Sequence, residues 1–166
     1  DARPETARYL VSKALAQTRS GLAETRRALH ELRASPLEDL GLPLALRSLA
    51  ESAALRAGAE LALELPAEDP GLPPATEQGL YRVAQEALNN AVRHGRPTHL
   101  HVGLVVNGAV TLTVRDNGRG FDPQDVDRRG HFGLRGLQER AGMLGATLEL
   151  QSTPGAGSTI IFRCRP

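Results

Sequence analysis

Two short apolar runs on either side of Asn107 and Gly108 constrain the fold of this 166-residue chain most strongly. From residue 98 to residue 106, apolar side chains recur at every second position, which is the period of a strand with one buried face. Residues 110–115 continue the alternation after the turn. Asn-Gly between two such runs is typical of a type I′ turn. The sequence therefore predicts an antiparallel hairpin over residues 98–115.

The remaining segments predict what packs on this hairpin. Pro43 suits a first helical turn and Gly58 suits a helix end, so a helix is expected between them. A loop rich in proline, residues 66–74, separates two further elements. The other expected elements are a helix at 132–144 and strands at 59–65, 147–151 and 158–163. Hairpin-linked strands with interspersed helices predict an α+β fold: a two-layer sandwich of a mixed, mostly antiparallel sheet with helices on one face.

Residues 75–94 predict a helix with two different stripes. One stripe carries Glu86, Asn90 and, a turn later, Arg93 and His94. An acid, an amide oxygen and cationic groups on one face could hold a hydrated magnesium ion and the phosphates that it bridges. From this helix alone, an ordinary solvated polar face is the favoured interpretation, and the segments that follow it in the chain reverse that preference. The other stripe is apolar and is expected to face the core: Leu80, Val83, Ala84, Ala87, Leu88 and Ala91.

Composition excludes several classes of protein. With 40% hydrophobic and 23% charged residues the chain is globular rather than disordered. A formal net charge of +1 with dispersed arginines argues against direct nucleic-acid binding. The single cysteine, Cys164, excludes an intramolecular disulfide and favours a reducing compartment. No apolar run approaches the ~20 residues that span a bilayer. We therefore expect the domain to be cytoplasmic.

Three glycine clusters follow the two-stripe helix. Residues 116–121 leave the end of a strand with Asp116, which can accept a hydrogen bond from an exocyclic amine, and with glycines that let the backbone pass close to a ligand. Residues 130–136 open the next helix, where free backbone N–H groups form an anion site. Residues 155–159 add hydroxyl groups beside a tight turn. Each cluster alone is also compatible with an ordinary turn.

In this order, the four stretches resemble the ATP-binding domain of sensor histidine kinases, a Bergerat-type fold. They are similar to the N box and the successive glycine boxes of a superfamily that includes DNA gyrase and the anti-sigma-factor kinases. Residues 85–94 and 130–140, with the leucines around Gly41, look like the class of bacterial kinases paired with LuxR-like response regulators. The resemblance covers residues 20–163. It is carried by Glu86 and Asn90, Asp116-x-Gly118-x-Gly120, residues 130–136, and Gly157-Ser158-Thr159.

The resemblance implies ATP and Mg²⁺ as cofactors and a role for each motif residue. Asn90 would ligate the magnesium ion, and Glu86 would be a catalytic polarising or general-base residue. Asp116 would bind the adenine amino group, with Thr159 supporting that end through Asp116 or a bound water. The other residues implied to contact ATP or shape its pocket are Arg93, His94, Gly118, Gly120, Phe121, Gly133, Leu134 and Gly136. The implied reaction transfers the γ-phosphoryl group to a histidine, for relay to a LuxR-like response regulator.

Residues 5–34 predict one long helix with a narrow apolar seam, as in a coiled coil or a helical bundle. The resemblance implies that residues 1–42 are the second helix of a dimerisation domain with its connector, and that residues 43–166 are the ATP-binding domain. The full-length protein would then be a homodimer, and its membrane anchoring is left open. We expect the phosphoacceptor histidine outside this chain, because His30 lies only one turn before the helix ends. The fragment should thus phosphorylate, at most, a histidine supplied in trans.

Two alternatives remain at this point. An anti-sigma-factor-type protein-serine kinase would share the ATP site, although such a kinase needs no dimerisation helix. A non-catalytic dimerising scaffold would use the seam alone, and the complete set of glycine, Asn and Glu positions argues against it.

Overall fold

The computed structural model describes residues 36–122 and 132–165. The chain divides into two units, Asp1–Asp39 and Leu40–Pro166. The long helix expected at residues 5–34 and the loop expected at 122–130, Asp122 excepted, lie outside the described residues. A short helix, α2 (Pro36–Leu40), stands where a connector without helix was expected. Glu38 and Asp39 in its first turn favour a helix start, because carboxylates stabilise the positive end of the helix dipole.

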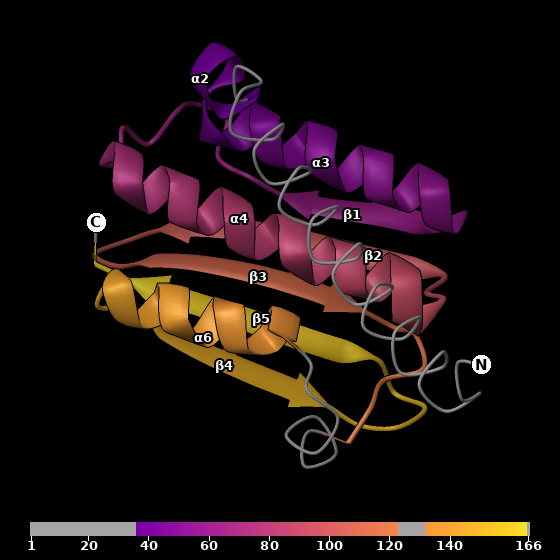
Figure 1. Cartoon of the computed structure of the whole chain (residues 1–166). Helices are drawn as coiled ribbons and strands as arrows, with labels where there is room; N and C mark the ends of the chain where they lie inside the picture. Colours follow the sequence, from indigo (N-terminus) through magenta and orange to yellow (C-terminus); the bar gives the residue numbers. More distant parts are fainter. Residues whose placement is uncertain (1–35, 123–131, 166) are drawn as a thin grey trace, which may run out of the picture. The chain divides into compact units, whose positions relative to one another are not determined.

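The second unit is a two-layer α+β sandwich, as predicted. In the described residues, helices α3 (Leu42–Ala57), α4 (Pro74–Asn90) and α6 (Phe132–Met143) cover one face of a five-stranded sheet (Figure 1). The strands are β1 (Glu60–Glu64), β2 (His99–Val106), β3 (Val110–Asp116), β4 (Thr147–Ser152) and β5 (Ser158–Cys164), in the order β1-β2-β3-β5-β4. Only the β1–β2 pair is parallel in this sheet, so the prediction of a mixed, mostly antiparallel sheet is confirmed.

The core lies between the sheet and the helices. Alternate residues of β2 and β3 point to it, and Phe162 of β5 is fully buried there. Full burial of a large apolar side chain contributes about 1.5–3 kcal/mol. The predicted apolar stripe of α4 and the turn after it is confirmed, since all six of its residues are buried: Leu80, Val83, Ala84, Ala87, Leu88 and Ala91.

The β2–β3 hairpin is confirmed, but its turn is not of type I′. Val106 and Val110 form the last pair, so the loop holds three residues, Asn107–Ala109. A type I′ turn needs positive φ at both central residues. Here Gly108 alone has positive φ, at 65°. The third loop residue removes the need for Asn107 to adopt that conformation.

The helix expected to run to His94 changes its winding before it ends. It is an α-helix to Asn90 and continues as one π-helical turn, η1 (Ala91–Gly95). Arg96, with φ 51° and ψ 55°, ends it. π turns of this kind occur often at functional sites.

Within the described residues, no helix is long and apolar enough to cross a membrane.

A candidate nucleotide site at the end of strand β3

Asp116 is a buried carboxylate at the carboxyl end of β3. It is 5% exposed and shares the helix-facing side of the sheet with Val114. Its Oδ1 accepts a hydrogen bond from the Gly118 N–H at 2.8 Å, and its Oδ2 accepts one from the Ser158 hydroxyl. An ionised carboxylate has about four acceptor positions, and the described residues fill two of them. Asp116 therefore retains capacity to accept an N–H donor from a ligand.

The loop after Asp116 passes so close to neighbouring backbone that two glycines are required. A Cβ atom on Gly118 would lie 2.5 Å from the Gly95 carbonyl oxygen and 2.8 Å from Asp116 Oδ1. A Cβ atom on Gly120 would overlap the Thr153 carbonyl oxygen. The predicted close backbone approach therefore occurs, and here it is to the protein's own chain.

Hydrogen bonds hold this loop between η1 and the β4–β5 hairpin. The Arg119 N–H donates to the Gly95 carbonyl at 2.8 Å, and the Gly155 N–H donates to the Arg119 carbonyl at 2.6 Å. The Phe121 N–H donates to Ser152 Oγ at 2.9 Å. Two segments distant in sequence thus fix the backbone around Asp116.

Glu86 and Asn90 are neighbours on α4, as their spacing predicts. Asn90 Nδ2 donates to Glu86 Oε1 at 3.3 Å, and both side chains are half-buried. This contact uses the amide nitrogen of Asn90. The amide oxygen of Asn90 and the second carboxylate oxygen of Glu86 have no hydrogen-bond partner among the described residues. Such oxygens are the ligands that Mg²⁺ prefers.

The described residues fit a magnesium ion held mainly by phosphates and water. They contain no group of three or more His, Cys, Asp or Glu side chains able to hold a metal ion. Mg²⁺ is commonly bound through one or two protein oxygens together with substrate phosphates and several waters. The Glu86–Asn90 pair matches that pattern.

The turn η1 joins the Glu86–Asn90 pair to the loop around Asp116. It begins directly after Asn90, and a Cβ atom on its last residue, Gly95, would lie 3.2 Å from Asp116 Oδ1. The carboxyl end of α4 and the end of β3 therefore lie at the same end of the domain (Figure 1). Both groups of predicted residues come together there.

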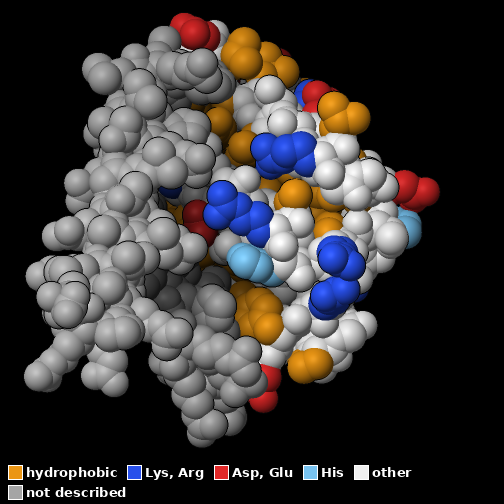
Figure 2. All heavy atoms as spheres, turned by 45° about the vertical axis from the view of Figure 1, so that its right-hand side comes forward, with side chains coloured by type: hydrophobic (Ala, Val, Ile, Leu, Met, Phe, Trp, Pro, Cys, Tyr) orange, Lys and Arg blue, Asp and Glu red, His pale blue; other side chains and the backbone are white. Residues whose placement is uncertain are grey.

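The same end carries basic side chains. Arg93, His94 and Arg96 are exposed on and beside η1. Figure 2 turns the right-hand side of Figure 1 forward and shows arginine and histidine side chains gathered on this surface. Exposed cations near a magnesium-binding pair suit the negative charge of phosphates.

The other predicted residues lie on two further segments. Phe121 is half-buried at the end of the glycine loop. Gly133 and Leu134 lie in the first turn of α6, and Gly136 is half-buried one turn further on. The roles of these four residues stay predictions.

The contact expected from Thr159 to Asp116 is made by Ser158 instead. Asp116 pairs with Ser158 across β3 and β5, whereas Thr159 pairs with Arg115. Successive side chains of a strand point to opposite faces, so Thr159 lies on the uncovered face of the sheet. The contact predicted from Thr159 to Asp116 is therefore wrong by one residue. Support of the adenine end by Thr159 through a water stays a prediction.

Three residues at this site were missed as functional residues: Gly95, Asn117 and Ser158. Ser158 lies opposite Asp116 in the β3–β5 register. The predicted strand does begin at residue 158, but its bounds alone do not give its register against β3. Gly95 and Asn117 act through segments far away in the sequence, and no local signal identifies such contacts.

The fold and this site define the class of protein. Residues 75–166 match the family described as histidine kinase-, DNA gyrase B-, and HSP90-like ATPases, and the chain belongs to this family. The fold is shared with the histidine kinase domain of the blue-light activated histidine kinase of Erythrobacter litoralis, with a TM-score of 0.63 at 22% identity. That match covers 75% of this chain and 60% of the other.

The curated relatives that this chain resembles are named as histidine kinases. The signal transduction histidine-protein kinase/phosphatase DegS of Brevibacillus brevis is 35% identical over 145 residues, covering 87% of this chain and 37% of the relative. The sensor histidine kinase MctS of Rhizobium johnstonii is 36% identical over 159 residues, covering 94% and 34%. The chain thus spans little more than a third of the length of these curated relatives. The predicted resemblance to the ATP-binding domain of sensor histidine kinases is confirmed.

Proposed function

We propose that this chain provides the ATP- and Mg²⁺-binding catalytic domain of a two-component sensor histidine kinase, which moves the γ-phosphoryl group of ATP to a histidine. One observation carries the proposal. A buried carboxylate with unused acceptor capacity, Asp116, and a pair of oxygen ligands, Glu86 and Asn90, are joined by a single helical turn. The histidine kinase relatives support the same reading.

Each group has a separate task in this proposal. Asp116 accepts the adenine amino N–H and so orients the base. Asn90 would hold the magnesium ion, which would supply charge neutralisation to the phosphates when bound. Arg93 adds positive charge and His94 a ring N–H donor at the same end. Such positioning and electrostatic work is most of what phosphoryl transfer requires from a protein.

Glu86 has its task in the transfer step. Its carboxylate accepts the N–H of the incoming imidazole, which makes the opposite ring nitrogen the better nucleophile. That nitrogen forms the new N–P bond while the bond to the leaving phosphate oxygen breaks and ADP departs. We propose that the acceptor histidine lies on a helix outside this chain, in a homodimeric and cytoplasmic kinase region. A response regulator, of LuxR-like type, then receives the phosphoryl group.

The magnesium assignment is tested by calorimetric titration with a non-hydrolysable ATP analogue, with and without Mg²⁺. The wild-type chain is expected to bind the analogue more tightly with Mg²⁺, and Asn90→Ala is expected to lose most of that difference. Asn89→Ala is the matched control, because its Oδ1 instead accepts from Arg56 Nη2 at 3.3 Å. Magnesium-independent or absent binding by the wild-type chain would reject the proposed function.

The adenine assignment is tested by Asp116→Asn. A hydrogen bond to a charged group contributes about 1.5–3 kcal/mol, so its loss should weaken binding by at least about tenfold. Asp69→Asn, at an exposed loop aspartate, is the control and should bind normally. Unchanged affinity in Asp116→Asn would show that another group reads the base.

A further inference from the structure

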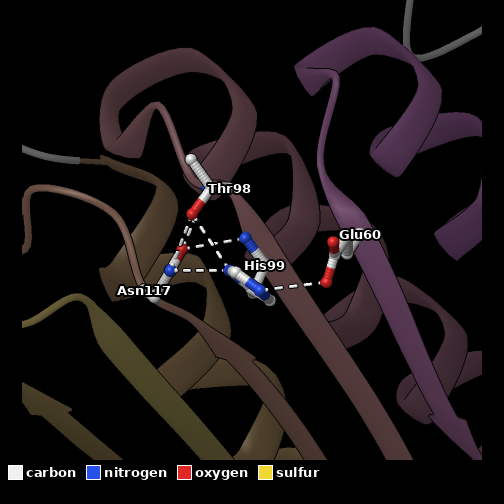
Figure 3. A network of polar contacts seen from close by, with 4 residues as sticks. All are labelled: Glu60, Thr98, His99 and Asn117. Atoms are coloured by element: carbon white, nitrogen blue, oxygen red, sulfur yellow. Dashed lines mark hydrogen bonds and ion pairs between the residues drawn. The ribbon is translucent and has the colours of Figure 1, made fainter.

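Asn117, the residue after Asp116, makes an unusually dense set of contacts for an exposed side chain. Its Oδ1 accepts from the Thr98 N–H and the His99 N–H, each at 2.9 Å. Its Nδ2 lies 2.9 Å from Thr98 Oγ1 and 3.0 Å from His99 Nδ1 (Figure 3). The Asn117 backbone N–H also donates to the His99 carbonyl, at 3.3 Å. Asn117 therefore extends the β2–β3 pairing beyond the last ladder pair.

These contacts continue to the edge strand β1. His99 Nε2 lies 3.0 Å from Glu60 Oε2, and Glu60 pairs with His99 in the parallel register. Glu60, His99 and Asn117 line a cavity of about 520 Å³ on the sheet face that the described helices leave uncovered, and Asp116 also contributes to its lining. The Asp116 carboxylate points to the opposite, helix-facing side. The network thus lies behind the carboxylate without contacting a ligand that the carboxylate binds.

The network also fixes the orientation of its own groups. Two backbone N–H donors at Oδ1 require the oxygen of the Asn117 amide there, so Nδ2 must face His99 Nδ1 as a donor. His99 Nδ1 then acts as the acceptor, and the Thr98 hydroxyl, whose oxygen accepts from Asn117 Nδ2, can donate to the same nitrogen at 3.0 Å. Its proton is consequently on Nε2, where it is donated to Glu60.

We propose that Glu60, His99 and Asn117 form a positioning network that holds Asp116 in the orientation that reads adenine. The inference rests on the proposed function, because it gives Asp116 the adenine role. Asn117 fixes the backbone immediately after Asp116, and the Gly118 N–H then reaches Asp116 Oδ1. His99 and Glu60 are positioning residues that act on Asp116 only through Asn117.

The contribution of each residue to the positioning of Asp116 decreases from Asn117 through His99 to Glu60. The side chains of His99 and Glu60 are 60% and 83% exposed, and exposed ion pairs contribute little. The two backbone N–H groups bound by Asn117 would lose their partner outright on its removal. Substitution of Asn117 should therefore cause the largest loss of ATP affinity, substitution of His99 a smaller loss, and substitution of Glu60 almost none.

The test compares nucleotide affinity and the ATP/GTP preference across a graded series. Asn117→Ala should weaken ATP binding at least about tenfold and lower the preference for ATP over GTP. His99→Ala should weaken ATP binding about two- to fourfold, and Glu60→Ala should bind ATP as wild type does. Asn117→Asp should bind within about threefold of wild type, since it keeps the oxygen that accepts both N–H groups. Asn107→Ala, the same change at the other end of β2, is the control and should bind normally.

The outcomes separate this inference from the proposed function. If wild type binds and Asp116→Asn binds weakly, but Asn117→Ala keeps full affinity and preference, the network has no positioning role. Failure of wild type to bind ATP overturns both. Should Asn117→Ala not fold, the decision passes to His99→Ala and to the His99 tautomer, read from imidazole nitrogen shifts by NMR. A proton on Nδ1, together with full affinity in His99→Ala, overturns the inference.

Discussion

The two glycines of the β4–β5 turn offer a direct test of how tightly the site is built. Gly155 and Gly157 have nearly equal φ angles, 82° and 81°. A Cβ atom on Gly155 would meet nothing within 4 Å. A Cβ atom on Gly157 would overlap the Asp116 carbonyl oxygen and would lie 2.8 Å from Asn117 Cα. Substitution by alanine at each position therefore differs almost only in its surroundings.

The expected magnitudes follow from that difference. Both variants carry the cost of a left-handed alanine, about 1–2 kcal/mol. Gly157→Ala carries a further ~1–3 kcal/mol for forced packing. To reach an ordinary contact of 3.4 Å, the 2.8 Å approach to Asn117 Cα must open by at least about 0.6 Å. Because displacements of about 1 Å can cost about 10²-fold in function, ATP affinity should fall about tenfold or more.

The assay pairs urea unfolding with ATP titration on the two variants. Gly155→Ala should lose only the backbone cost in free energy of unfolding and should bind ATP within about threefold of wild type. Gly157→Ala should lose more stability and most of its affinity. Equal losses in the two variants would refute the reasoning, because they would show that the turn moves freely away from Asp116.

Three further predictions concern single side chains. Ser158→Ala should weaken ATP binding about tenfold by removing the hydrogen bond to Asp116, whereas Thr159→Ala should leave it unchanged, and equal titration curves would contradict the observed register. Phe162→Ala should lower the free energy of unfolding by about 3–5 kcal/mol, and a loss under about 1 kcal/mol in urea would contradict its full burial. Burial raises the pKa of the Cys164 thiol above its ordinary value of 9.0, so the unfolded thiol ionises first and stability falls as pH rises past 9.0. Cys164→Ala should therefore lose less stability than wild type between about pH 8 and pH 10, and parallel losses would exclude the thiol as the cause.

Much of this fold could be predicted because apolar residues recur with the period of the helix or strand that buries them. The apolar stripe of α4 and the alternation in β2 each decide which face is buried, and both were predictable from the sequence. Asp116 and the Glu86–Asn90 pair were also predictable, since the first lies at a strand end and the second is set by helix spacing. These features depend on neighbours within one element.

The predictions that were wrong concern strand register, turn length and helix winding, where a shift of one residue changes which side chains meet. Whether Ser158 or Thr159 faces Asp116 depends on the register of β5 against β3, and a shift of one residue moves every side chain to the other face. The π winding of η1 and the third residue of the loop at Asn107 are likewise not distinguished by apolar periodicity. Asn117 binds residues 98 and 99, at a sequence distance that no local pattern encodes.

The two ends of the sheet differ in how much space surrounds their turns, and so in whether they can accept an inserted segment. At the Asp116 end, Gly118, Gly120 and Gly157 are each closed in by backbone. At the opposite end lie the β2–β3 turn and the turn before β4, where Gly108 and Gly145 have no atom within 4 Å of an added Cβ. Exposed turns with such room are where chains accept insertions. Extra segments, natural or engineered, can therefore be joined at the second end while the nucleotide end keeps its length.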